Sequence, residues 1–433
     1  MPALKMPPKK SSPKSARKTP GRKRSISVPK KKAAVPKKSA AKKPSALVRR
    51  RRVLLKAVRR RAANFVPEPP KPHRLERHDG NPIIGPREGN YWEMKATFNP
   101  GAVYADHRVH LLYRAIGGDD VSVLGYAASD DGLTFDDRSH APAFGPRSGQ
   151  LKEERQEASA NEMVSERKGP PIEARYFSGG GWNGGVEDPR LTLLGDRVYL
   201  TYTAFDGWGS IRMAMSSIAL EDFLNRRWKW RRPALISPPG EIHKNWVLFP
   251  EKINGKFAIL HGITPSVLIE YRDSLDFAED DFIRSPRPSN DRVKIREGVW
   301  DSWIRGVGPP PIKTDLGWLL FYHAMDLKDP NRYKLGAMIL DLDDPSKVLY
   351  RTRSPILEPD FDYENNGFKS GVVYSCGAVV KDGELFVYYG GADSVTCVAM
   401  ADLDTFLRQL TTYGVPRLDQ EPTTTRPPRN ARR

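Results

Sequence analysis

Five hairpin signals, spaced roughly 60–90 residues apart, constrain the fold of this chain more than any other feature. Each places two apolar or aromatic runs around a short turn with Gly, Asp or Asn, and a further apolar run follows. Five antiparallel units predict an all-β chain, namely a five-bladed β-propeller, with a β-sandwich as the structural alternative. The five hairpins read AVYADHRVHLLYRA, RLTLLGDRVYLTYTA, EKINGKFAILHGI, PIKTDLGWLLFYHA and AVVKDGELFVYYGG.

The charge of the chain is divided between two segments. The formal net charge is +19, yet 24 of the 71 Lys and Arg residues lie before Phe65, where no Asp or Glu occurs. The remaining 47 basic residues face all 52 acidic ones, which leaves a net charge of −5. This division excludes a uniformly basic nucleic-acid-binding fold. It predicts a disordered Lys/Arg/Pro-rich tail over residues 1–64, because so few large apolar groups cannot offset the entropy of ordering.

We expect the tail to bind nucleic acid or another polyanion without sequence preference and with strong salt dependence; a solubilising extension is the alternative. The propeller is then assigned to residues 65–420, and residues 421–433 to a second disordered end. No apolar stretch approaches the roughly 18 residues that suggest a membrane span. The two cysteines, Cys376 and Cys397, predict reduced thiols in the cytoplasm. The sequence leaves the oligomeric state open.

Two adjacent carboxylates, Glu187 and Asp188, follow a Gly-rich approach at the mouth of a predicted inner strand. A carboxylate in this place can act as a general acid, with Arg190 orienting it or lowering its pKa. In the alternative interpretation the segment is only a turn, in which Asp188 caps the strand and Arg190 pairs with Glu187. Candidates that would grip sugar hydroxyls together with Asp188 are Asn99, Arg114 and Asp393.

Basic and polar residues recur at the openings of the other predicted blades. Lys244, Arg305, His323 and Tyr333 form a set of donors suited to an anion such as phosphate, although each alone is more often a surface or core residue. No HExxH, CxxC or Walker-type motif is present in the chain. The sequence therefore indicates neither a metal nor a nucleotide cofactor.

Seven strings give the chain a resemblance to a known family over roughly residues 80–410. With them the chain resembles glycoside hydrolase family 130, which comprises β-mannoside phosphorylases and related β-mannosidases. The resemblance implies a five-bladed propeller and an inverting cleavage of β-mannosides. The strings, in order, are FNPGAV, LLYRA, GGVEDPRL, VLFPEKINGKFAILH, GPPPIKTDLGWLLFYHA, YKLGAMILDLDDP and YYGGAD.

The resemblance also assigns roles to the candidate residues. It implies that Asp188 is the general acid and acts through a mannose hydroxyl, while phosphate, or water in the hydrolases, attacks the anomeric carbon from the opposite side. Arg305 stands at the position of the family's phosphate-binding lysine. The resemblance implies that Asn99, Arg114 and Asp393 hold the mannose, and that His323 and Tyr333 bind phosphate together with Arg305. From their places in the sequence, Glu187 and Arg190 are predicted as further substrate-binding residues and Lys244 as a further phosphate-binding residue.

One position departs from the family pattern. Gly262 stands where the phosphorylases usually have an arginine, and Lys244 or His243 are candidates to supply the missing charge. Neither Gly262 nor Arg305 is the glutamate that marks the hydrolytic members. We therefore expect phosphorolysis of β-manno-oligosaccharides to mannose 1-phosphate, with inorganic phosphate as co-substrate and no cofactor. A β-mannosidase and a non-catalytic glycan-binding propeller are the alternatives.

Overall fold

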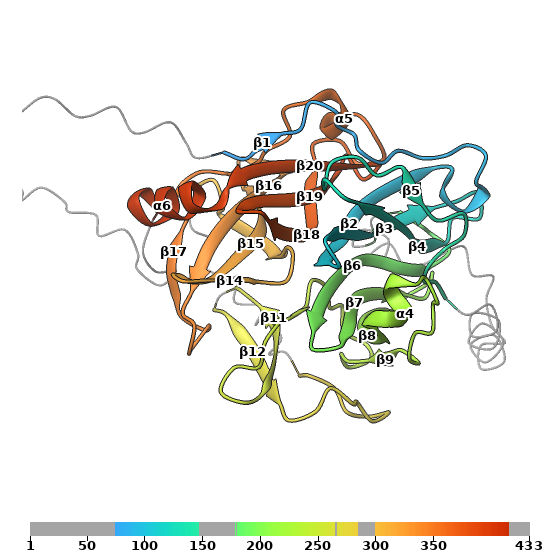
Figure 1. The fold of residues 1–433 in the computed structure, drawn as a ribbon, viewed down its shortest axis with the longest axis horizontal. Coiled ribbons are helices and arrows are strands. Elements are labelled where there is room, and N and C mark those ends of the chain that lie inside the picture. The colour runs from blue at the N-terminus through green and yellow to red at the C-terminus, as the bar shows by residue number, and fades with distance from the viewer. Residues whose placement is uncertain (1–73, 147–177, 179, 265, 285–298, 415–433) are drawn as a thin grey trace, which may run out of the picture. The chain divides into compact units, whose positions relative to one another are not determined.

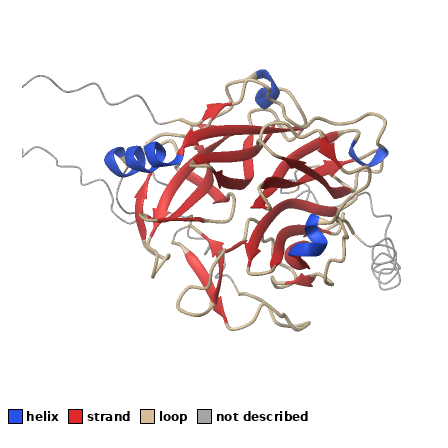
Figure 2. Ribbon diagram, viewed as in Figure 1, coloured by secondary structure: helices blue, strands red, loops and turns tan. Residues whose placement is uncertain are grey.

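The fold is built from antiparallel strands that follow the predicted hairpins (Figures 1 and 2). The computed structural model describes residues 74–146, 178, 180–264, 266–284 and 299–414. Both predicted disordered segments, 1–64 and 421–433, lie outside the described residues. Within the described part of the chain, no helix has the length and apolar character needed to cross a membrane.

Tight turns close the hairpins where the sequence places Asn, Asp or Gly. Asn254 and Gly255 have φ of 51° and 80°, and Asp382 and Gly383 have φ of 53° and 83°. Positive φ at both central residues is the geometry whose twist matches that of the flanking strands, and Asn-Gly and Asp-Gly adopt it most readily. The short turn signals therefore fix the pairing of the long strands on either side.

The strands form four sheets, which we describe as five units in chain order, because the eight-stranded sheet joins two hairpin groups through a single parallel contact between Ser122 and Gly185. The predicted hairpins and their following strands are confirmed. Unit 1 contains β2 (Ala96–Ala105), β3 (Arg108–Ile116), β4 (Ser122–Ser129) and β5 (Asp137–Arg138), preceded by the 3-10 helix η1 (Tyr91–Glu93). Unit 2 contains β6 (Gly185–Leu194), β7 (Arg197–Phe205), β8 (Ile211–Ala219), α4 (Leu220–Leu224) and β9 (Ala234–Leu235). Unit 3 contains β10 (Val247–Leu248), β11 (Phe257–Gly262) and β12 (Leu268–Arg272).

The last two units follow the same plan. Unit 4 contains β13 (Trp303–Val307), β14 (Ile312–Thr314), β15 (Gly317–Asp326), β16 (Asp329–Leu340) and β17 (Val348–Arg351). The helix α5 (Asp362–Asn365) then leads to unit 5, which contains β18 (Val373–Lys381), β19 (Glu384–Gly391) and β20 (Val395–Asp402) and is followed by α6 (Leu403–Tyr413). The outer edge of unit 5 is completed by β1 (Glu76–Arg77), which pairs with β20.

Each unit buries apolar side chains against its neighbours, and the five largest core clusters of the described residues lie between units. Four clusters lie between consecutive units, and a fifth joins the last unit to the first. Burial of these side chains is the main driving force for holding the units together. Representative pairs, in order around the units, are Leu112 with Leu200, Met213 with Leu248, Leu260 with Leu320, Phe321 with Leu385, and Tyr388 with Tyr113.

A buried ion pair ties the start of the described chain to the loop ahead of unit 5. Arg77 of β1 donates from Nε to Glu364 Oε1 at 2.7 Å and from Nη2 to Oε2 at 3.0 Å. Glu364 is fully buried in α5, and its backbone carbonyl accepts hydrogen bonds from the amides of Gly371 and Val372. The pair therefore fixes the segment that leads from α5 into β18.

We expect Arg77→Ala to lower the free energy of unfolding by about 3–5 kcal/mol, because it leaves the buried Glu364 carboxylate without its partner. Arg74→Ala is the matched control, since Arg74 pairs with Glu358 and Asp360 but is 42% exposed. An exposed pair contributes about 0–1 kcal/mol. Urea unfolding followed by tryptophan fluorescence measures both, and equal small losses in the two variants would contradict this role of Arg77.

Candidate active site

Two β-bulges place polar side chains from units 1 and 2 next to each other. The register of β2 against β3 shifts between Phe98 and Gly101, and that of β6 against β7 shifts between Glu187 and Arg190. Asn99 and Asp188 lie in these shifts, each before a proline, with φ of 48° and 52°. A bulge re-aims a side chain that would otherwise alternate with the pleat, and a positive φ is a strained backbone conformation that is often found at functional sites.

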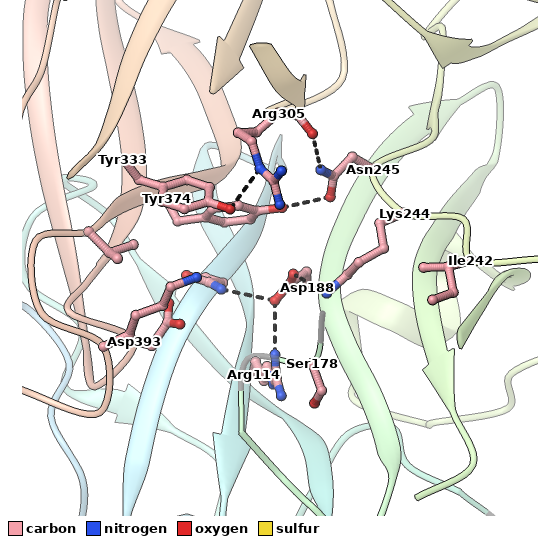
Figure 3. A pocket seen from close by; sticks show the side chains of 13 residues that line it. Arg114, Ser178, Asp188, Ile242, Lys244, Asn245, Arg305, Tyr333, Tyr374 and Asp393 are labelled. Carbon is pink, nitrogen blue, oxygen red and sulfur yellow. Dashed lines mark hydrogen bonds and ion pairs between the residues drawn. The ribbon is translucent and has the colours of Figure 1, made fainter. Parts of the chain in front are cut away.

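The two bulged residues contact each other directly. Asn99 Nδ2 donates a hydrogen bond to Asp188 Oδ1 at 2.9 Å (Figure 3). The position opposite Asn99 on β19 is Gly390, where a Cβ would come within 2.1 Å of Asn99 Oδ1. Glycine at this position of unit 5 therefore leaves the room that the Asn99 side chain needs.

Arg114 of β3 holds both carboxylates of the β6 bulge. It is fully buried and donates from Nη1 to Asp188 Oδ1 at 3.2 Å and from Nη2 to Glu187 Oε1 at 2.9 Å. Lys244, in the segment before β10, donates from Nζ to Glu187 Oε2 at 3.1 Å and lies 3.8 Å from Asp188 Oδ2. A buried arginine and a half-buried lysine thus bracket two buried carboxylates, which is the pairing that buried charges require.

The electrostatic environment keeps Asp188 ionised in the free pocket. Burial by itself would raise the pKa of the Asp188 carboxyl, but the positive charges of Lys244 and Arg114 outweigh this effect. Arg190 and the hydrogen bond from Asn99 act in the same direction. The pKa of Asp188 is therefore held below its ordinary value, so the empty pocket contains a carboxylate and not a carboxylic acid.

The second side of the pocket is formed by units 4 and 5. Arg305 of β13 donates from Nε to the hydroxyl of Tyr333 on β16 at 2.9 Å, and its guanidinium lies 4.4 Å from the centre of the Trp303 ring. Tyr374 of β18 donates its hydroxyl to Asn245 Oδ1 at 2.6 Å. Figure 3 shows this aromatic and basic side facing Asp188.

These side chains enclose a pocket of about 260 Å³ that is open to solvent. Seven of the ten residues predicted from the sequence line it. Asp188 is contacted by Asn99, Arg114 and Lys244, the last two of which are labelled beside it in Figure 3. The lining residues are Asn99, Arg114, Ser178, Asp188, Ile242, Lys244, Asn245, Arg305, Tyr333, Lys369, Val372, Tyr374 and Asp393.

Three predicted site residues lie behind the pocket wall. Glu187 is fully buried and accepts hydrogen bonds from Arg114, Lys244 and Ser178. Arg190 does not pair with Glu187 as the turn interpretation expected; it donates to the carbonyl of Asp188 at 2.8 Å and to Asn245 Oδ1 at 2.9 Å. Arg190 therefore stabilises the backbone of the bulge, and it lies outside the set of residues that line the pocket.

His323 is the third of these residues. Its ring is fully buried and stacks on Tyr374 with 4.0 Å between ring centres, and its Nε2 accepts a hydrogen bond from the amide of Ser375 at 2.9 Å. Burial lowers the pKa of His323 to about 3, and the charge of Arg190 acts in the same direction. A neutral ring behind Tyr374 supports that tyrosine. His323 is not among the residues that line the pocket, and its contact with phosphate stays a prediction.

The position of Gly262 lies on β11, where a Cβ would meet the side chain of Leu268. Of the two residues proposed to replace the missing charge, Lys244 lines the pocket. His243 does not: its ring packs against Trp246 and its Nε2 contacts Glu241 at 2.8 Å. The geometry therefore favours Lys244, and its role in supplying the missing charge stays a prediction.

Six lining residues were missed from the sequence. Asn245 has a detectable signal in the sequence, since it directly follows the polar residues His243 and Lys244. Tyr374 lies in a mostly apolar strand, so its hydroxyl gives no local sign of facing a pocket. The others stand in connecting segments or in an apolar run, and they are Ser178, Ile242, Lys369 and Val372.

Comparison with known proteins places the chain among mannoside-cleaving enzymes. The family model of glycoside hydrolase family 130, described as beta-1,4-mannooligosaccharide phosphorylase, matches residues 179–411, more than half of the chain. A 1,2-beta-oligomannan phosphorylase of Thermoanaerobacter sp. is 36% identical over 338 residues, which cover 76% of this chain and 98% of the relative. A beta-1,2-mannobiose phosphorylase of the same organism is 35% identical over 76% of this chain and 97% of its own length.

Solved structures give the same picture. A beta-1,2-mannobiose phosphorylase from Listeria innocua, in complex with beta-1,2-mannobiose, is 25% identical with a TM-score of 0.56; the alignment covers 78% of this chain and 99% of that one. A putative glycosidase from Bacteroides thetaiotaomicron is 28% identical with a TM-score of 0.57, over 76% of this chain and 96% of that chain.

The environment of Asp393 generates a pH prediction. Burial raises the pKa of Asp393 to about 6; the charge of Lys369 opposes the rise and the nearby Asp188 carboxylate adds to it. The native state then holds a proton that the unfolded chain has already released between about pH 4 and 6. The native state is therefore destabilised relative to the unfolded chain as pH rises through this window, by up to about 3 kcal/mol.

Asp393→Asn removes this titration. We compare the free energies of unfolding of the unchanged protein and of the variant at each pH. The difference, unchanged protein minus variant, should fall by up to about 3 kcal/mol between pH 4 and 7, because only the unchanged protein loses stability as Asp393 ionises. Urea unfolding at several pH values measures the difference, and the subtraction cancels the groups that titrate in both proteins. Parallel pH profiles would show that Asp393 has an ordinary pKa.

Proposed function

The chain belongs to glycoside hydrolase family 130, and on this premise we propose that it is a glycoside phosphorylase that cleaves β-manno-oligosaccharides with inorganic phosphate and releases mannose 1-phosphate. Two relatives that match most of this chain are named as phosphorylases of β-1,2-linked mannosides, and a third, from Ruminococcus albus, as a beta-1,4-mannooligosaccharide phosphorylase. The substrate class is therefore a β-mannoside.

The charge balance of the pocket is the observation that carries phosphorolysis. When all the lining groups are ionised, they comprise four cations and two carboxylates, an excess of two positive charges. A phosphate dianion matches this excess, and basic side chains are the usual ligands of phosphate. The resemblance to the family gives its hydrolytic members two glutamates that hold water, and this chain has Gly262 and Arg305 at those positions. The cations are Arg114, Lys244, Arg305 and Lys369, and the carboxylates are Asp188 and Asp393.

Phosphate binding also accounts for how Asp188 becomes an acid. In the free pocket Lys244 and Arg114 keep the pKa of Asp188 low. A dianion bound beside Lys244 offsets these positive charges, so the pKa of Asp188 rises when phosphate and sugar are both present. Asp188 is thus protonated in the complex in which its proton is needed, and not in the free enzyme.

The reaction is balanced with one proton relay. A phosphate oxygen forms the new bond to the anomeric carbon while the glycosidic C–O bond breaks, with inversion. The leaving sugar oxygen takes a proton that Asp188 supplies through a mannose hydroxyl, as the family resemblance implies. The proton that remains on the esterified phosphate is then released, and Asp188 is reprotonated from the solvent or from this group. No metal or organic cofactor takes part in this scheme.

The remaining lining residues divide between the two substrates. Asn99 and Asp393 lie on the unit 1 and unit 5 side and are proposed to hold mannose hydroxyls together with Arg114. Arg305 and Tyr333 face them from unit 4 and are proposed to bind phosphate (Figure 3). Asp188 lies between these two groups of residues. In the proposed complex it therefore lies between the mannose and the phosphate that attacks it.

We infer further that the five units are the blades of a closed β-propeller. Two observations support this arrangement. The five core clusters join each unit to the next and the last to the first. In addition, the amide of Thr97 in unit 1 donates to the carbonyl of Ser394 in unit 5 at 3.0 Å, and the Thr396 hydroxyl donates to the carbonyl of Thr97 at 3.0 Å.

The test of the function is turnover of β-1,2- and β-1,4-mannobiose with and without inorganic phosphate. We expect mannose 1-phosphate, seen by ³¹P NMR, only when phosphate is present. Asp188→Asn should lower the rate about 10²–10⁴-fold, since it removes general acid catalysis. Asp382→Asn is the matched control, because Asp382 has nearly the same φ, 53° against 52°, but lies in the β18–β19 turn. Free mannose released without phosphate would establish a hydrolase, and binding without turnover would establish a glycan-binding module.

A further inference from the structure

A lysine that no motif singled out stands at the rim of the pocket. Lys369 lies in the connection between α5 and β18, is exposed, and lines the pocket together with Arg305 and Tyr333. Its Nζ lies 4.5 Å from the centre of the Tyr333 ring. The lysine is thus held against an aromatic face at the side of the pocket that carries Arg305.

Tyr333 contacts two cations at once. The guanidinium of Arg305 lies 5.8 Å from the centre of the same ring, and Arg305 Nε donates to the Tyr333 hydroxyl at 2.9 Å. A cation within about 6 Å of an aromatic ring is attracted by the ring quadrupole. Tyr333 therefore positions a lysine and an arginine on one side of the same pocket.

The backbone around Lys369 is fixed by neighbouring strands. The amide of Lys369 donates to the carbonyl of Ala392 at 3.0 Å, and the amide of Tyr333 donates to the carbonyl of Gly371 at 2.9 Å. The amide of Phe368 donates to the Ser394 hydroxyl at 2.9 Å. These contacts hold the backbone of Lys369 close to Asp393 and Tyr333, so its side chain starts from a fixed place at the pocket rim.

Neither cation forms a salt bridge within the described residues, although the charge of Lys369 acts on the nearby Asp393 carboxylate. The salt bridges there include neither Lys369 nor Arg305, whereas Arg114 and Lys244 are paired with Glu187 and Asp188. Two like charges on one side of a pocket repel each other, and an anion bound between them removes that cost. We propose that Lys369 is a phosphate-binding residue that acts together with Arg305 across Tyr333. This assignment rests on the phosphorolytic function proposed above.

Lysine suits this position because its ammonium is a compact charge on a flexible stem and can follow a phosphate that enters from solvent. Arg305, stacked between Trp303 and Tyr333, is the more rigid partner. The pair then contacts phosphate from the solvent side, while Lys244 contacts it from the side of Asp188.

The test is the kinetics of Lys369→Gln with β-1,2-mannobiose. We expect the KM for phosphate to rise on the order of tenfold, the loss of one charge-assisted contact, with little change in the KM for the disaccharide. In the reverse direction the KM for mannose 1-phosphate should rise and that for the acceptor mannose should not. Lys369→Arg should restore most of the phosphate affinity, because it retains the charge.

Lys252→Gln is the matched control. Lys252 also lies over an aromatic ring, 4.3 Å from the centre of Phe257, but it does not line the pocket. It should leave every KM unchanged. Titration of each protein with inorganic phosphate by calorimetry provides a second readout that does not depend on turnover, and circular dichroism verifies folding.

The outcomes separate this assignment from the function itself. An unchanged phosphate KM in Lys369→Gln, while the unchanged protein phosphorolyses mannobiose, overturns the role of Lys369 alone. A rise only in the disaccharide KM would also overturn it and assign Lys369 to sugar binding. Absence of phosphate-dependent turnover in the unchanged protein would instead overturn the proposed function on which the assignment rests.

Discussion

The ion pairs between Arg114, Lys244 and the two carboxylates of the β6 bulge are the interactions on which the pocket depends. All four groups lie at or beneath the pocket floor, where an unpaired charge would be costly. They come from units 1, 2 and 3, so the carboxylates are compensated only when these units are packed together. The buried core clusters between the units therefore also assemble the charge arrangement of the site.

The same arrangement links binding to chemistry. Paired cations hold Asp188 as a carboxylate while the pocket is empty, and two further cations, Lys369 and Arg305, form no salt bridge among the described residues. A phosphate dianion satisfies the second pair and weakens the effect of the first on Asp188. In this account phosphate is both the nucleophile and the agent that converts Asp188 into an acid. Cleavage by water lacks this second contribution, which favours phosphorolysis over hydrolysis.

The sequence was sufficient for the parts of the structure that depend on local signals. Turn residues such as Asn254 and Asp382 located the hairpins, and the polar residues Asn99 and Asp188 before proline marked the bulges. The sequence was insufficient where long-range packing decides. Nothing local shows that Arg190 turns to the carbonyl of Asp188, that His323 lies behind Tyr374, or that Lys369 reaches Tyr333 from a different unit. Those contacts depend on how the units meet, and not on any one strand.

The most direct test of this account is the ionisation of Asp188 with and without phosphate. Carboxyl ¹³C NMR of protein labelled at aspartate, with Asp188→Asn to identify the signal, measures its pKa in both states. The account predicts a pKa below the ordinary aspartate value in the free protein and a clear rise when phosphate binds together with mannose. A pKa that is ordinary in the free protein, or that does not move on addition of phosphate, would contradict the claim that phosphate makes Asp188 an acid.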